Sequence, residues 1–225
     1  MKLFLCSSFI TPEIKADFTN LVGNWAKNPR VACITTAFDG YKEHCQQRGE
    51  NPDLSWFDYE DSFARKNLNW NIDLIDLNEI SENDLRVFDQ YDGIWIEGGL
   101  MLPLVKAIYK TRFDTFLMNY LQKDTFFVGT SAGSMVCATS LDCAEWYIGE
   151  PEPGVAKYKG LGLVDYQIYP HFNKTNLPAI LSARLKHEEY WLLKDGQAIS
   201  FDGNAHKICG GDITVLKSDR NIYSA

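Results

Sequence analysis

The sequence predicts an α/β protein of three layers, with a mostly parallel β-sheet, helices on both faces of that sheet and a β-rich C-terminal tail. Two observations predict this fold. As far as Met135, short apolar runs alternate with segments of helical periodicity, which is typical of a parallel sheet covered on both sides. Near the end of the chain, two short apolar runs at 198–201 and 212–216 are bounded by Gly- and Asp-containing turns, which indicates further strands.

Length and charge limit the classes of protein. The chain has 225 residues, of which 45% are hydrophobic, so we expect one domain spanning 1–225 with a core that needs no disulfide or metal. The formal net charge of −8 comes from 30 acidic and 22 basic residues. Without a basic patch, nucleic acid and anionic membrane surfaces are disfavoured as partners.

The six cysteines show no Cys-x-x-Cys pair and no metal-ligand spacing. We interpret them as reduced thiols and expect a cytoplasmic protein that holds no metal and no organic cofactor. The opening apolar stretch, 1–10, is too short for a secretion signal and is predicted to be the first strand. No stretch reaches the roughly 18 to 20 apolar residues of a membrane span.

The first half of the chain begins with a βαβ pattern. A strand at 3–6, a helix from about 12 to 27 and an apolar run at 30–37 form it, with Pro12 well suited to the first turn of the helix. A helical stretch at 56–67 then precedes the alternating apolar and polar residues of 71–77, which predict a strand.

The elements around the centre of the chain follow the same alternation. Before Ser131, the pattern predicts a short helix that begins at 81–85, a strand at 91–97 followed by two glycines, a helical stretch at 102–121 and an apolar strand at 126–128. After it, the pattern predicts loops at 150–154 and 159–163, a strand at 166–172 and a helix at 178–193. A loop is expected at 38–51, and whether it covers the site is left open.

The run Gly129-Thr130-Ser131-Ala132-Gly133 follows an apolar strand and precedes small residues. Such a strand-to-helix turn is the nucleophile elbow, in which the serine hydroxyl is exposed on a sharp corner and the glycines allow close backbone approach. A purely structural turn also favours small residues, but it does not need a serine between two glycines. Ser131 is therefore the candidate nucleophile.

A serine nucleophile needs a base, and the chain has four histidines. His44 and His187 lie in polar, helical surroundings that are typical of surface residues. His171 follows a predicted strand and Pro170, where side chains at the edge of a parallel sheet face the crevice. We therefore rank His171 first, with a histidine satisfied by a backbone carbonyl as the alternative.

The base needs an acid to orient it. Asp202 follows the predicted strand 198–201, and an Asp-Gly turn between two antiparallel strands is the alternative interpretation of the same residues. Four other carboxylates compete for the role, namely Asp142, Glu145, Asp165 and Asp212. For the oxyanion hole, we expect one backbone N–H from Ala132 and a second from Gly99 or Leu100.

These residues together resemble the dipeptidase E and cyanophycinase family of serine peptidases, whose fold is related to class I glutamine amidotransferases. The resemblance runs through the whole chain and rests on four pieces, which are Asp92-Gly93-Ile94-Trp95-Ile96-Glu97-Gly98-Gly99, Gly129-Thr130-Ser131-Ala132-Gly133-Ser134, Gly160-Leu161-Gly162-Leu163 and Tyr169-Pro170-His171-Phe172.

The resemblance implies a triad of Ser131, His171 and a carboxylate, with Asp202 standing where the family often has glutamate. It implies removal of short N-terminal units from small peptides, in some members after an N-terminal aspartate, which Arg184 would bind. Members usually have asparagine after the glycine pair, whereas this chain has Leu100, so a polar contact to substrate is absent there. A small peptide is the expected partner, and a homodimer is left open.

Other functions remain as alternatives. In an α/β-hydrolase esterase the acid precedes the histidine after the nucleophile, giving Asp165 or Asp195 with His206. A non-catalytic peptide-binding relative would keep the crevice without efficient turnover, as Leu100 suggests. A glutamine amidotransferase is disfavoured because that chemistry uses a cysteine at the position of Ser131.

Overall fold

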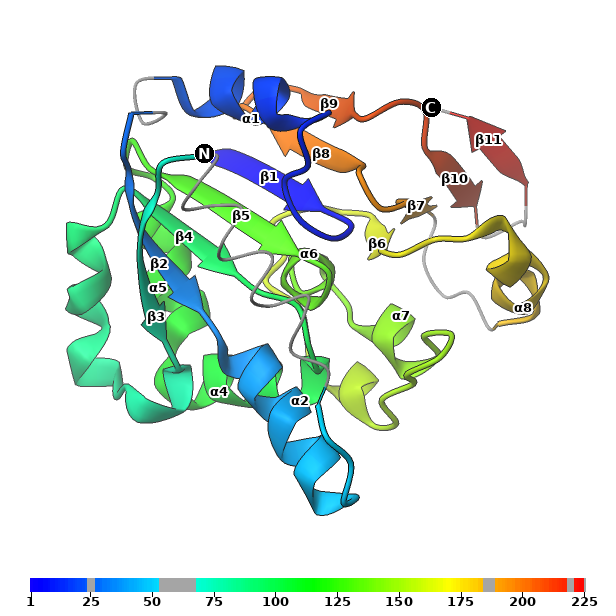
Figure 1. Ribbon diagram of the computed structural model, residues 1–225, viewed down its shortest axis with the longest axis horizontal. Helices are drawn as coiled ribbons and strands as arrows, with labels where there is room; N and C mark the ends of the chain where they lie inside the picture. The colour runs from blue at the N-terminus through cyan, green and yellow to red at the C-terminus, as the bar shows by residue number, and fades with distance from the viewer. Residues whose placement is uncertain (24–26, 53–67, 184–188, 218–220, 225) are drawn as a thin grey trace.

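The computed structural model describes residues 1–23, 27–52, 68–183, 189–217 and 221–224. Within them a large sheet of seven strands has the order β3-β2-β4-β5-β1-β8-β9 (Figure 1). Its members are β1 (Lys2–Cys6), β2 (Arg30–Ile34), β3 (Asn71–Ile75), β4 (Gly93–Ile96), β5 (Phe126–Thr130), β8 (Ala198–Phe201) and β9 (His206–Cys209). The strands from β3 to β1 run parallel, whereas β8 is antiparallel to β1 and to β9.

A second sheet of four strands has the order β11-β10-β7-β6 and lies beyond one end of the large sheet (Figure 1). It consists of β6 (Gln167–Tyr169), β7 (Glu189–Leu192), β10 (Thr214–Lys217) and β11 (Ile222–Ser224). β6 and β7 pair in parallel, so their carboxyl ends lie side by side. The other two pairings are antiparallel.

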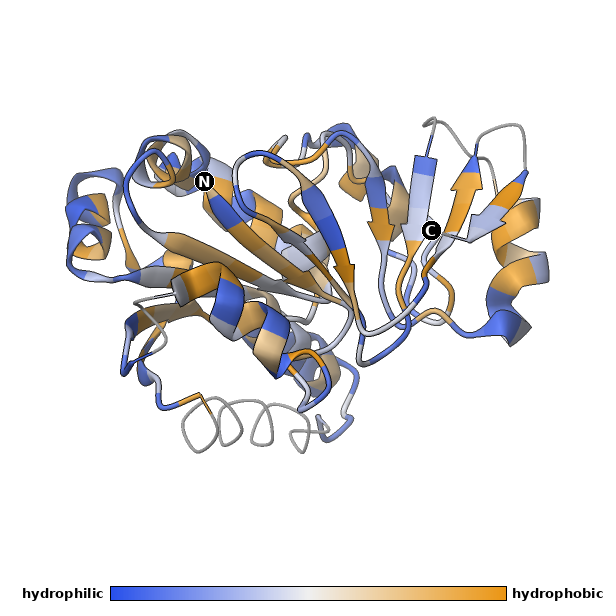
Figure 2. Ribbon diagram, turned by 90° about the horizontal axis from the view of Figure 1, so that it is seen from above, coloured by the Kyte–Doolittle hydropathy of each residue, from blue (hydrophilic) through white to orange (hydrophobic). Residues whose placement is uncertain are grey.

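The central strands of the large sheet are buried on both faces, as the side chains of β1 show. Leu3 and Leu5 belong to the apolar core on one face, while Phe4 and Cys6 belong to the core on the other, because successive side chains of a strand point to opposite faces. Figure 2 shows the apolar strands of this sheet between helices on its two sides. The layered α/β class predicted from the sequence is confirmed.

The α-helices in the described residues are α1 (Lys15–Val22), α2 (Thr36–Gln47), α4 (Met101–Thr111), α5 (Phe113–Tyr120), α6 (Ala132–Met135), α7 (Asp142–Glu145) and α8 (Leu177–Ser182). Short 3₁₀ helices are η2 (Leu77–Glu79), η3 (Glu82–Gln90), η4 (Val155–Lys157) and η5 (Lys174–Asn176). In the part of the chain that the structure describes, no helix is long and apolar enough to cross a membrane.

Three predicted elements differ from the structure. The apolar run 30–37 is a strand only as far as Ile34, and the helix α2 begins at Thr36. The Thr36 hydroxyl donates to Asp76 Oδ1 at 2.9 Å. Because α2 extends to Gln47, much of the predicted loop 38–51 is helix. The helical stretch 102–121 is broken at Arg112, where φ is 61°. In both segments, an apolar pattern that is continuous in the sequence is divided between two elements of the structure.

The third difference matters most for the site. The predicted helix 178–193 is only the short helix α8, and its last part is the strand β7, which pairs with β6 and β10. Tyr190 and Leu192 alternate as buried residues with Glu189 and Trp191, which are partly exposed, and this is the period of a strand. The predicted helix 56–67 lies outside the described residues.

Candidate active site

Ser131 lies at the turn between β5 and α6, at the carboxyl edge of the parallel strands. Its φ of 51° is unusual for a residue with a side chain. The turn is tight because a Cβ atom on Gly133 would lie 2.0 Å from the carbonyl oxygen of Ile96, and one on Gly129 would lie 2.5 Å from that of Gly133. The two glycines therefore let the turn pack against β4 and hold the serine at its corner.

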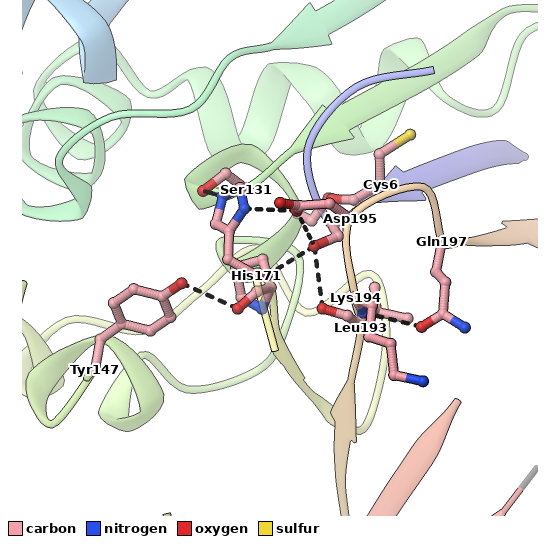
Figure 3. Close-up of polar contacts among 11 residues, drawn as sticks. Cys6, Ser131, Tyr147, His171, Leu193, Lys194, Asp195 and Gln197 are labelled. Carbon is pink, nitrogen blue, oxygen red and sulfur yellow. Dashed lines mark hydrogen bonds and ion pairs between the residues drawn. The ribbon is translucent and has the colours of Figure 1, made fainter. Parts of the chain in front are cut away.

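His171 follows β6, and its side chain points toward Ser131 (Figure 3). Its Nε2 lies 3.0 Å from Ser131 Oγ. Its own backbone has a φ of 52°, and two neighbouring bonds hold it: the Tyr147 hydroxyl donates to the carbonyl of Pro170 at 3.0 Å, and the N–H of Phe172 donates to the carbonyl of Leu193 at 2.8 Å.

Asp195 completes the group of three side chains. Its Oδ1 lies 2.7 Å from His171 Nδ1. A carboxylate can only accept a hydrogen bond, so Nδ1 carries the proton and Nε2 is left to accept the Ser131 hydroxyl. The bond from His171 is the largest cause holding the pKa of Asp195 below its ordinary value, although partial burial opposes it. This is the arrangement of a nucleophile, a base and an orienting acid.

The loop that carries Asp195 follows β7, and hydrogen bonds of the Gln197 side chain hold it in place (Figure 3). The Gln197 side chain accepts the N–H of Lys194 at 2.9 Å and donates to the carbonyl of Asp212 at 2.9 Å. Because β6 and β7 are parallel neighbours, His171 and Asp195 emerge at the same edge of the small sheet.

Two backbone N–H groups lie beside the serine without an acceptor among the described residues, those of Gly99 and Ala132. Gly99 has a φ of 128°, and a Cβ atom there would lie 2.3 Å from the carbonyl oxygen of Ala37, so this position requires glycine. The N–H of Leu100, in contrast, donates to that same carbonyl at 3.0 Å. Of the two residues predicted as the second oxyanion donor, only Gly99 has its N–H available.

A cavity of about 410 Å³ opens over these groups. Aromatic and apolar side chains form much of its wall, including Phe9, Tyr41, Met101, Met135 and Tyr147, and carboxylates of Glu150, Glu152 and Asp195 also line it. No Lys or Arg in the described part of the chain does so. Glu152 accepts the N–H groups of Met101 and Leu102, each at 2.7 Å, and burial raises its pKa.

Comparison with known proteins gives the family of this chain. A model of peptidase family S51 matches residues 10–209. The chain belongs to peptidase family S51. It is therefore a serine-type peptidase, and the resemblance to the dipeptidase E family noted from its motifs is confirmed.

Relatives of this S51 peptidase span different shares of the chain. An uncharacterized peptidase of Pasteurella multocida is 25% identical over 185 residues, covering 81% of this chain and 82% of that protein. Peptidase E of Streptomyces coelicolor is 31% identical over 101 residues, 44% of this chain and 40% of that protein. A crystal structure from Listeria monocytogenes, provisionally named a peptidase E, has a TM-score of 0.71 at 16% identity and covers 92% of this chain and 96% of its own, which supports the fold.

Asp202, the acid predicted from the sequence, is not brought to His171. It follows β8, which is antiparallel to β1, and the pairing of Phe201 with Leu3 places it at the opposite end of β1 from Ser131. Its exposed carboxylate accepts the N–H groups of Asn204 and Ala205 at 2.9 and 3.1 Å. Asp202 thus lies in an Asp-Gly turn between the antiparallel strands β8 and β9, as the alternative interpretation of the sequence predicts.

The remaining candidates lie as follows. His206 is on the edge strand β9, opposite Phe201, and contacts the Tyr166 hydroxyl at 2.8 Å, so it is not brought to Ser131. Arg184 and His187 lie outside the described residues. The sequence predicts Asp195 only as the acid of the esterase alternative, paired with His206. The signal in the sequence is the run of aromatic and apolar residues that includes Tyr190 and Leu192, which indicates a strand that ends shortly before Asp195.

Proposed function

We propose that this peptidase hydrolyses short peptides through an acyl-enzyme on Ser131, with His171 as the base and Asp195 as the acid that orients it. The supporting observation is the chain of contacts from Asp195 Oδ1 to His171 Nδ1, 2.7 Å, and from His171 Nε2 to Ser131 Oγ, 3.0 Å. These distances suit direct proton transfer.

The steps follow from these contacts. Ser131 Oγ attacks the scissile carbonyl carbon while its proton moves to His171 Nε2, and Asp195 stabilises the imidazolium that forms. The N–H groups of Gly99 and Ala132 stabilise the oxyanion of the tetrahedral intermediate. The intermediate expels the amine, which takes the proton from His171. A water molecule, activated by His171 in turn, then attacks the ester and releases Ser131.

The size and lining of the cavity support a short peptide as substrate. A cavity of about 410 Å³ is of the size of small-molecule sites, roughly 300 to 1,000 Å³. The carboxylates of Glu150 and Glu152 disfavour a negatively charged side chain of the substrate in the cavity and favour the positive charge of its free amino terminus. We therefore propose that an N-terminal aspartate is accepted less well than a neutral residue. Hydrolysis of Asp-Leu faster than Ala-Leu would refute this preference.

The first experiment is labelling with a fluorophosphonate probe, with the modified residue found by mass spectrometry. We expect labelling of Ser131 in the wild type and none in Ser131→Ala or His171→Ala. His206→Ala is the matched control and should label normally, since its ring contacts Tyr166 and Phe201 instead. A folded wild-type protein without labelling would refute the acyl-enzyme and favour a peptide-binding protein. Loss of labelling in His206→Ala would favour the esterase alternative.

We also propose a cytoplasmic location. All six cysteines are buried, reduced thiols, which suits a reducing compartment. Fractionation of the native cells checks this proposal. The homodimer stays a prediction, which sedimentation velocity would test.

A further inference from the structure

Ser7 is the first residue after β1 and has no solvent-exposed surface. β1 lies between β5, which carries Ser131, and β8 in the large sheet. Ser7 therefore emerges beside Ser131 at the same edge of the sheet. It does not line the cavity, so it is not placed to touch a substrate.

The backbone of Ser7 contacts both the nucleophile and the loop of the acid. Its carbonyl accepts the N–H of Ser131 at 3.1 Å, and its own N–H donates to the carbonyl of Gln197 at 3.0 Å. Gln197 closes the turn that carries Asp195, because its N–H donates to the carbonyl of Lys194 at 3.0 Å. The end of β1 is thus attached to both segments.

The side chain of Ser7 contacts the other two members of the triad. Its Oγ accepts the N–H of His171 at 2.7 Å and lies 3.0 Å from both Asp195 Oδ1 and the carbonyl of Leu193. A hydroxyl has one proton to donate and lone pairs to accept. Ser7 Oγ can therefore hold the His171 backbone and, with its proton, either the Asp195 carboxylate or the Leu193 carbonyl.

This position matters because the triad comes from two sheets. Ser131 follows β5 of the large sheet, whereas His171 and Asp195 follow β6 and β7 of the small sheet. Proton transfer from Ser131 requires that the two sheets keep the imidazole within hydrogen-bond distance of the hydroxyl. Ser7 directly follows β1 of the large sheet and contacts both loops that follow strands of the small sheet. The left-handed backbone of His171, at φ 52°, is also held by its bond to Ser7.

We propose that Ser7 is a positioning residue that sets the distances within the triad of Ser131, His171 and Asp195. This inference rests on the proposed function, since it assigns Ser7 a role in the acylation of Ser131. Ser7 acts through the three side chains and takes no part in bond making.

The test compares Ser7→Ala with wild type in steady-state hydrolysis of a dipeptide and in the rate of fluorophosphonate labelling. We expect kcat and the labelling rate to fall by about 10- to 100-fold with KM within about twofold, because a displacement of about 1 Å at a reacting centre has an effect of that size. Ser7→Thr keeps the hydroxyl and should recover most of the loss. Ser200→Ala is the matched control, since Ser200 is a buried serine of β8 that contacts no triad residue.

Ser7→Cys replaces the alanine variant if that variant does not fold, because its shape is close to serine while sulfur bonds weakly. A folded Ser7→Ala or Ser7→Cys enzyme with unchanged kcat would overturn the proposal, as would a rise in KM without a fall in kcat. A folded Ser7→Thr variant as damaged as Ser7→Ala would assign the effect to packing and would also overturn it.

A crystal structure of Ser7→Ala tests the inference independently of turnover. We expect the His171 ring to move out of hydrogen-bond distance of Ser131 Oγ or Asp195. An unchanged triad in that structure would overturn the positioning role. A wild-type protein that neither labels nor hydrolyses peptides would instead refute the proposed function, and the crystal structure would still decide the role of Ser7.

Discussion

Asp195→Asn is the substitution that most directly tests the proposed triad. The carboxylate lies 2.7 Å from His171 Nδ1, and the two side chains are 63% and 39% exposed. Two unit charges about 4 Å apart interact by about 1 kcal/mol in water and about 4 kcal/mol at the effective dielectric constant of a protein surface. Partial exposure places this pair between those limits. At a factor of ten for each 1.36 kcal/mol or so, loss of the charge slows the reaction by about fivefold to about a thousandfold.

The choice of asparagine moves the expected loss toward the upper limit. An amide can donate to His171 Nδ1, which would favour the tautomer with its proton on Nε2, facing Ser131 Oγ. That tautomer cannot accept the serine proton. We therefore expect kcat/KM and the labelling rate of Asp195→Asn to fall by about a hundredfold to a thousandfold.

The assay measures labelling of Ser131 by the fluorophosphonate probe and hydrolysis of a dipeptide, with Asp202→Asn as the matched control. The amide introduced by Asp202→Asn would keep a side-chain oxygen that can accept the N–H groups of the turn, so activity should stay within about twofold of wild type. A loss below about threefold in Asp195→Asn, or an equal loss in both variants, would refute the assignment of Asp195 over Asp202.

Three further predictions concern stability, pH and metals. Gly133→Ala places a Cβ 2.0 Å from the Ile96 carbonyl oxygen and should lower the free energy of unfolding by about 3 kcal/mol or more; a urea midpoint equal to wild type would contradict the tight turn. The lowered pKa of Asp195 means that its ionised form stabilises the fold above its unfolded pKa of about 3.9, and that this is lost as pH falls through the lower folded pKa. The free energy of unfolding in urea should therefore be lower for Asp195→Asn than for wild type at neutral pH, and the difference should shrink as the pH is lowered. A difference that does not change with pH would argue against this contribution of Asp195. EDTA should leave peptide hydrolysis intact, and inactivation that zinc reverses would overturn the expectation of a metal-independent enzyme.

Some features of the site could be predicted because they depend on local chemistry. The turn around Ser131 needs small residues before and after it, since a Cβ on Gly129 or Gly133 would collide with backbone atoms, and the sequence pattern carries that need directly. The glycine at position 99 can also be seen in the sequence, although its contact with Ala37, which requires glycine together with a φ of 128°, is known only from the structure. The alternation of strands and helices over the first half of the chain likewise predicted the parallel sheet.

The carboxylate that meets His171 could not be found in this way, because its place depends on strand direction and pairing. The sequence predicts a helix before Asp195, whereas the structure has the strand β7 there, so in the structure both Asp195 and Asp202 follow strands. β8 pairs antiparallel with β1 and carries Asp202 to the opposite end of β1 from Ser131. β7 pairs parallel with β6 and carries Asp195 to His171.

The sequence by itself determined the turn that carries Ser131, the glycine pair at the end of the strand before it and the class of fold, because a run of small residues after an apolar strand and the periodicity of side chains can both be seen in the sequence. Only the tertiary structure decided which carboxylate meets His171 and that Ser7 lies among the three triad residues. Both depend on how two separate sheets are placed against each other, and that placement is set by contacts between residues more than a hundred positions apart, such as Ser7 and His171.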